Sequence, residues 1–148
     1  MKPVTGMVIR VESPHGQHPI VPTRAEQLPV SASHLEVERK RHALALERDL
    51  ASLVAQLKAM PAVHKVILFG SYAAGRRDLF TDLDVLVVIE SELDFVARNV
   101  ELARRIHATV ALDLLAYTPR EMELMAGRPF VRHALQTSKV LYERRSPA

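Results

Sequence analysis

The sequence contains no cysteine, and aromatic residues make up only 5% of its 148 positions. Without cysteine the chain forms no disulfide and offers no thiolate ligand to a zinc ion. Its longest unbroken apolar run, Val85 to Ile89, is far shorter than the ~20 residues that cross a bilayer. The first residues also lack the apolar run of a signal peptide. These absences predict a soluble, cytoplasmic protein that does not associate with membranes.

Neither sign of charge is in large excess. The chain has 20 Lys and Arg residues and 17 Asp and Glu residues, for a net charge of +3. This mildly positive balance suits a polyanionic substrate such as a nucleoside triphosphate. The sequence has no aromatic-rich basic patch, so a nucleic-acid groove is not expected. With 48% apolar and 25% charged residues, the chain has the composition and length of one globular domain.

Proline is concentrated at the start of the chain, where five of the nine prolines fall within the first 29 residues. Proline removes backbone donors and fixes φ, so no long helix is expected there. We predict that residues 1–33 form an extended, proline-rich arm with one short strand, Met7–Val11. His15 and His18 have a spacing that could bind zinc on a helix, but the prolines on either side disfavour one.

Residues 34–148 have the pattern of a single α/β domain. Apolar residues at spacings of three and four predict a helix over residues 34–60, with Ser33 as its N-cap and Pro61 just past its end. A capping box opening at Thr118 predicts another helix that ends near Gly127. The remaining expected elements are strands at 63–69, 84–89, 110–117 and 139–142, a short helix from Gly70, and helices at 94–108 and from Pro129.

The segment from Gly70 to Val88, GSYAAGRRDLFTDLDVLVV, contains the residues best suited to bind phosphate. Gly70 allows a phosphate to approach the backbone closely. The free N–H groups at a helix start, together with the Ser71 hydroxyl, form an anion site. Arg76 and Arg77 are close enough in sequence to add positive charge, although a solvated surface position is an equal alternative for both.

Three aspartates are candidate metal ligands. Asp82 and Asp84 are two apart at the start of a strand, so both carboxylates face one spot, where they repel each other unless a cation lies between them. Asp113 interrupts an apolar strand, and it joins the other two if that strand lies beside the Asp84 strand. Oxygen ligands suit Mg²⁺, and three acids suit a two-metal displacement. A turn or helix cap for Asp82 and Asp84, and a solvated strand edge for Asp113, are the alternative interpretations.

Gly70-Ser71, ten intervening residues and Asp82-x-Asp84 before an apolar strand resemble the defining motif of the DNA polymerase β-like nucleotidyltransferase superfamily. The segment ALDLLAYTPREM that carries Asp113, the Pro129-Phe130 helix start and the KVLYE ending resemble the minimal nucleotidyltransferases. Those proteins pair with HEPN-domain proteins in toxin–antitoxin modules. The likeness spans residues 63–142 and implies an α+β fold with a small mixed sheet flanked by helices.

The resemblance also implies roles for individual residues. Gly70 and Ser71 would hold the triphosphate, while Asp82, Asp84 and Asp113 would bind two Mg²⁺ ions. Asp113 would in addition deprotonate or orient the attacking hydroxyl. The implied reaction is transfer of AMP from ATP to an acceptor hydroxyl. The implied acceptor is a tyrosine of a HEPN-type toxin partner, which would make this protein the antitoxin.

Two other functions stay open at the level of sequence. The first is a non-catalytic antitoxin, a binding module that neutralises its partner by contact alone. The second is a small-molecule nucleotidyltransferase, although such enzymes usually carry a second helical domain and the segment after Asp113 is short. A homodimer through the apolar stripe of the first helix and the N-terminal arm is a further expectation.

Overall fold

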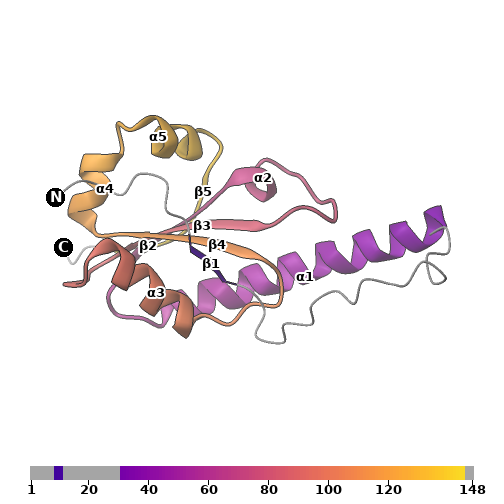
Figure 1. The fold of residues 1–148 in the computed structure, drawn as a ribbon, viewed down its shortest axis with the longest axis horizontal. Helices are drawn as coiled ribbons and strands as arrows, with labels where there is room; N and C mark the ends of the chain where they lie inside the picture. The colour runs from indigo at the N-terminus through magenta and orange to yellow at the C-terminus, as the bar shows by residue number, and fades with distance from the viewer. Residues whose placement is uncertain (1–8, 12–30, 146–148) are drawn as a thin grey trace.

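The computed structural model describes residues 9–11 and 31–145 and shows one five-stranded sheet with helices on both faces (Figure 1). The strand order is β1-β4-β3-β2-β5, in which only β3 and β4 are parallel neighbours. The predicted α+β fold with a small mixed sheet is therefore confirmed. The elements are β1 (Ile9–Val11), α1 (Ala32–Lys58), β2 (Val63–Phe69), α2 (Gly70–Ala73), β3 (Leu83–Ile89), α3 (Phe95–Arg105), β4 (Leu112–Tyr117), α4 (Pro119–Met125), α5 (Pro129–Gln136) and β5 (Lys139–Glu143).

Of the predicted arm, the structure describes β1, which confirms the last three residues of the predicted strand, and residues 31–33, which begin α1. The rest of the predicted arm, including His15 and His18, lies outside the described residues up to position 30. The division into an arm and a single domain stays a prediction. No helix among residues 31–145 is long and apolar enough to cross a membrane.

Helix α1 begins two residues earlier than the sequence indicated, and its predicted cap is wrong. The N-cap is Ser31, whose side chain accepts a hydrogen bond from the His34 N–H at 3.2 Å. Ser33 lies inside the first turn, where its hydroxyl is 3.0 Å from that of Ser31. Two serines in this short segment can each cap a helix, and the sequence alone does not rank them.

Strand β4 begins at Leu112, two residues later than predicted, because a buried carboxylate takes up the backbone donors before it. Asp49, on the buried side of α1, accepts hydrogen bonds from the N–H groups of Thr109 and Val110 at 2.5 and 2.8 Å. Those residues are therefore tied to α1 and not to a neighbouring strand. The contact anchors the segment that leads into the Asp113 strand.

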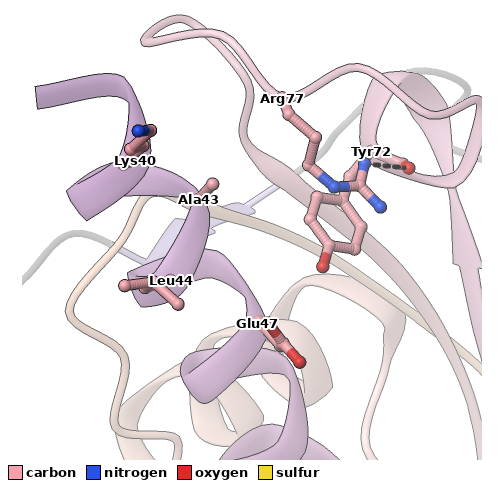
Figure 2. Close-up of a pocket in the computed structure, with 6 residues that line it drawn as sticks. All are labelled: Lys40, Ala43, Leu44, Glu47, Tyr72 and Arg77. Carbon is pink, nitrogen blue, oxygen red and sulfur yellow. Dashed lines mark hydrogen bonds between the residues drawn. The ribbon is translucent and has the colours of Figure 1, made fainter. Parts of the chain in front are cut away.

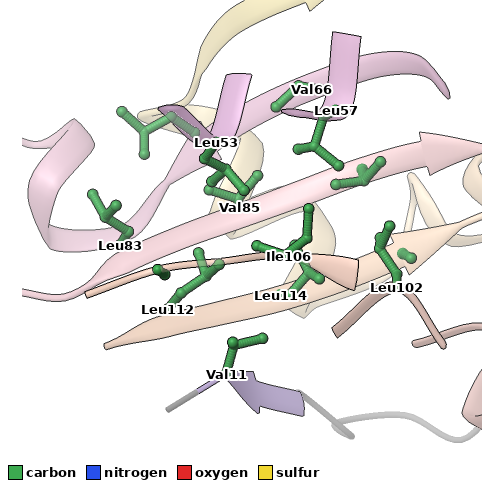
Figure 3. Close-up of a cluster of buried hydrophobic side chains, with 14 of the residues drawn as sticks. Val11, Leu53, Leu57, Val66, Leu83, Val85, Leu102, Ile106, Leu112 and Leu114 are labelled. Carbon is green, nitrogen blue, oxygen red and sulfur yellow. The ribbon is translucent and has the colours of Figure 1, made fainter. Parts of the chain in front are cut away.

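One face of the sheet packs against α1 and α3 and forms the larger hydrophobic cluster (Figure 3). Leu53 and Leu57 of α1 are at most 1% exposed, and they meet Val66 and Val85 of the central strands. The predicted apolar stripe of α1 is thus core in its C-terminal half. Toward its N-terminal end the helix leaves Leu35, Val37 and Leu44 exposed. The homodimer stays a prediction.

The opposite face packs against the short helices α4 and α5 and forms a smaller cluster. Side chains alternate along each strand, so Leu86 and Val88 belong to this face while Val85 and Val87 belong to the α1 face. The capping box predicted at Thr118 is confirmed at the start of α4. The members of this cluster are Ile67, Phe69, Leu86, Val88, Leu115, Tyr117, Met125, Val131 and Ala134.

Candidate active site

The three predicted carboxylates converge at the N-terminal ends of β3 and β4. The parallel register pairs Asp84 directly with Asp113, and Asp82 lies just before β3. By alternation along the strands, the Asp84 and Asp113 side chains lie on the α4 and α5 face, opposite to Leu83 and Leu112. The two short helices cover other positions on that face. The condition set for Asp113, that its strand lies beside the Asp84 strand, is therefore met, and the carboxylates share one end of the sheet.

Crowding of negative charge changes the protonation of Asp84. Burial raises its pKa to about 7, with further contributions from the charge of Asp113, a hydrogen bond with Asp113 and the charge of Asp82. The nearby Arg10 opposes the rise. A carboxyl group that is partly buried beside two other acids is expected to hold its proton near neutral pH.

The positive charge at this site comes from Arg10 in β1, a residue that no sequence motif selects. The antiparallel pairing of β1 with β4 sets Arg10 opposite Asp113. Its Nε donates to Asp113 Oδ1 at 3.0 Å, and its Nη2 donates to Asp82 Oδ2 at 2.7 Å. Hydrogen bonds to Asp113 and the charges of both acids raise the pKa of Arg10 above its ordinary value. Arg10 therefore bridges two of the three acids.

Three carboxylate side chains are suitable ligands for a divalent cation. In this structure two of them, Asp82 and Asp113, bond the Arg10 guanidinium. No group of three His, Asp or Glu side chains within the described part of the chain is gathered closely enough to hold a metal ion. Carboxylate oxygens are the ligands that Mg²⁺ prefers. The raised pKa of Asp84 and the bridging of Asp82 and Asp113 by Arg10 both reflect negative charge gathered at this end of the sheet. Asp82, Asp84 and Asp113 are the residues that fit such an ion.

Gly70 connects β2 to the short helix α2 and lies against Asp84. Its φ is +74°, in the left-handed region that glycine tolerates best. A Cβ at this position would lie 2.2 Å from Asp84 Oδ2, far inside van der Waals contact. The glycine is therefore required by both backbone conformation and space. It brings the predicted phosphate-binding segment, Gly70 and Ser71, directly beside a candidate metal ligand.

Arg76 and Arg77 both interact within their own loop. Arg76 forms an ion pair with Asp78, whose carboxylate also accepts a hydrogen bond from the Phe80 N–H. Arg77 donates to the Tyr72 carbonyl at 2.8 Å and stacks on the Tyr72 ring at 3.5 Å. Each arginine thus stabilises the loop between α2 and β3, and its predicted phosphate contact stays a prediction.

A pocket of about 440 Å³ lies between α1 and this loop. Figure 2 shows the Arg77 guanidinium stacked on Tyr72 on one side and Lys40, Ala43, Leu44 and Glu47 of α1 on the other. Tyr72 follows Gly70 by two residues, so α2 contacts the carboxylate cluster through its first residue and borders the pocket through its third. The pocket lies on the α1 side of α2, whereas Asp84 and Asp113 lie on the α4 and α5 face.

A second group of polar side chains, not selected from the sequence, fixes the strand that carries Asp113. Arg98 of α3 is 3% exposed, donates to the Ala116 carbonyl at 3.0 Å and forms an ion pair with Glu121. The buried Asn99 side chain both donates to the Ala116 carbonyl and accepts from its N–H. Asn99 thereby bonds the backbone of β4 at Ala116, past the residues that pair with the short strand β1. The sequence signal for this contact was the pair Arg98-Asn99, two polar residues at positions of α3 that are buried.

Comparison with known proteins identifies the family of this arrangement. The family model for "Polymerase beta, Nucleotidyltransferase" matches residues 51–147, which include all three aspartates and Gly70. No curated protein matches the chain. The family assignment therefore rests on a match over about two thirds of the sequence.

Three solved structures share parts of the fold at low similarity. One, a candidate nucleotidyltransferase from Sulfolobus solfataricus, is 21% identical with a TM-score of 0.47, over 73% of this chain and 86% of that one. A mutant MntA–HpeT toxin–antitoxin is 22% identical with a TM-score of 0.40, over 67% and 73%. A toxin–antitoxin with AMP-PNP is 21% identical with a TM-score of 0.38, over 67% and 74%.

Proposed function

The chain belongs to the polymerase β nucleotidyltransferase family, and on that premise we propose that it transfers AMP from ATP to an acceptor hydroxyl. The observation that supports this reaction is the convergence of Asp82, Asp84 and Asp113 beside Gly70. The parallel β3–β4 pairing holds two of these acids at adjacent positions, and the short α2 begins against one of them. A nucleotide whose phosphates lie along Gly70 and Ser71 reaches all three.

In this proposal each residue has a separate task. The backbone and hydroxyl at Gly70 and Ser71 bind the triphosphate oxygens. Asp82, Asp84 and Asp113 would hold Mg²⁺, which when bound neutralises charge on the leaving pyrophosphate. Asp113 also accepts the proton of the attacking hydroxyl or orients it. Arg76 and Arg77, on the loop between α2 and β3, would add positive charge for the triphosphate.

For the acceptor we propose a tyrosine hydroxyl on a HEPN-type toxin partner, with this chain as the antitoxin. The support for this step is the sequence resemblance of residues 63–142 to the minimal nucleotidyltransferases. AMP on that tyrosine would add a bulky phosphodiester and a negative charge to the partner. A non-catalytic antitoxin and a small-molecule transferase are the alternatives that the experiment below separates.

The test measures transfer of label from α-phosphate-labelled ATP and Mg²⁺ to protein in a lysate of source cells. Wild type is compared with the Asp82→Asn/Asp84→Asn double variant. The matched control is Glu92→Gln/Glu123→Gln, which removes two negative charges at exposed positions away from the site. We expect one labelled band with wild type and control, and none with the aspartate variant.

Each outcome selects one function. A band that depends on Asp82 and Asp84 identifies the acceptor by its mass and supports protein AMP transfer. Label found only in small molecules supports the small-molecule transferase. Absence of transfer with folded wild type, together with partner inhibition that survives the double substitution, refutes catalysis and supports the binding module.

A further inference from the structure

The Arg10 side chain occupies the space between two candidate metal ligands. It donates to Asp113 Oδ1 at 3.0 Å and to Asp82 Oδ2 at 2.7 Å, so one guanidinium spans both carboxylates. Among the described residues, no other Lys, Arg or His forms an ion pair with either acid. Within the described part of the chain, Arg10 is thus the residue that forms ion pairs with these two acids.

Arginine and a divalent cation compete for these oxygens. A guanidinium stays protonated at any ordinary pH, and here its N–H donors take Asp113 Oδ1 and Asp82 Oδ2. A dication bound to the same atoms would be within a few ångströms of a fixed positive charge, and like charges at that separation repel strongly in a partly desolvated site. Each cation therefore weakens the binding of the other.

The position of Arg10 makes its departure feasible. Strand β1 has three residues and lies at the edge of the sheet, paired only with β4. The Arg10 side chain is 48% exposed, whereas those of Asp82 and Asp113 are 31% and 24% exposed. The guanidinium can swing into solvent on its own long side chain while Val11, on the opposite face of β1, remains packed in the core.

We propose that Arg10 is an internal competitor of the divalent cation, which binds Asp82 and Asp113 only when the guanidinium withdraws. This inference rests on the metal site in the proposed function and adds a regulator to it. In the nucleotide-free protein the arginine keeps the site closed to metal alone. A segment of the N-terminal arm thereby controls when the carboxylates become available.

The first test measures Mn²⁺ binding to the nucleotide-free protein by the electron paramagnetic resonance signal of free Mn²⁺. We expect Arg10→Gln to bind Mn²⁺ about tenfold more tightly than wild type, or better, because a competing charge is removed. The matched control is Arg105→Gln, which removes the same charge from an exposed position in the last turn of α3. It should bind like wild type.

A further variant separates failure of this inference from failure of the metal site. Asp82→Asn combined with Arg10→Gln should lose the tightened binding. If it does not, the metal site itself is refuted. If Asp82→Asn weakens binding but Arg10→Gln equals wild type, the metal site stands and the competition is refuted.

A second measurement needs no variant and covers the case in which Arg10→Gln does not fold. The Arg10 Nε–H is bonded to Asp113, so we expect a protected side-chain signal for it in nitrogen–proton NMR spectra of the wild type. Titration with diamagnetic Mg²⁺ should move this signal to the position of a free, exchanging arginine. A signal that is unchanged when Mg²⁺ saturates the protein overturns the proposal.

Discussion

The two faces of the sheet differ in how they are covered. The α1 and α3 face is packed along the length of the central strands by a 27-residue and an 11-residue helix. The opposite face is covered by α4 and α5, of 7 and 8 residues, and it also carries Asp84 and Asp113 at the ends of its strands. The same strands thus contribute mainly stability on one side and chemistry on the other.

Strand alternation makes this division possible. In β4, Leu112 and Leu114 point to the α1 face, while Asp113 between them points away. A carboxylate can therefore lie between two buried leucines without entering the main core. The division predicts that substitutions on the two faces have separable effects on folding and on the site.

The largest expected effect comes from truncating neighbouring leucines on opposite faces of β4. Leu114 is 0% exposed in the α1 face cluster, and Leu115 is 2% exposed in the α4 and α5 cluster. We expect Leu114→Ala to lower the free energy of unfolding by about 3–5 kcal/mol and Leu115→Ala by about 2–3 kcal/mol, because the thinner layer relaxes around a cavity more easily. Urea titrations measure both, and equal losses would contradict the comparison.

A smaller loss of stability is expected from a substitution at Gly70, which lies against Asp84. Gly70→Ala places a Cβ in a left-handed conformation and against Asp84, so we expect a loss of about 1–2 kcal/mol or more. The matched control is Gly127→Ala, where an added Cβ meets open space. Thermal unfolding should separate the two, and a neutral Gly70→Ala would show that Asp84 readily moves aside.

A pH-dependent effect is expected from Asp84, whose pKa is raised to about 7 in the fold. Between about pH 4 and pH 7 the folded protein keeps a proton that the unfolded chain releases, so stability falls as pH rises through this window. Asp84→Asn should lack this fall. Urea midpoints at pH 5 and pH 8 in the presence of a chelator test the sign, and parallel behaviour of both proteins would show that the pKa is not raised.

The smallest expected effect concerns the arginines of the loop. Arg77 borders the pocket and Arg76 is paired with Asp78, so Arg77→Gln should raise the KM for ATP about two- to fivefold while Arg76→Gln changes it less. Steady-state kinetics with both variants provide the comparison. A larger effect for Arg76 would mean that its ion pair opens when the nucleotide binds.

Elements with local signals were predicted well from the sequence. The bounds of β2 follow from an apolar run that Gly70 ends, and the start of α4 follows from the Thr118 capping box. In both cases neighbours within a few positions determine the structure. The convergence of Asp84 and Asp113 was expected only on the condition that their strands are neighbours, which the parallel β3–β4 pairing meets.

Contacts between distant segments were not predictable in the same way. Arg10 joins Asp113 across 103 positions, and Asp49 joins Val110 across 61. An arginine in a short strand and an aspartate in a helix have many possible partners, and the choice depends on how the elements pack. The error at Ser33 has a different cause, since two nearby serines can each cap the same helix and Ser31 is the one that does.

The order of the strands in the sheet has a consequence for how the protein assembles. The central strands β2, β3 and β4 are consecutive in the chain, whereas β1 joins β4 only by closing a loop of roughly a hundred residues. Contacts that distant cost the most entropy and form late in folding. The three acids are therefore expected to meet first, unneutralised, and the arginine from the far end of the chain to arrive afterwards.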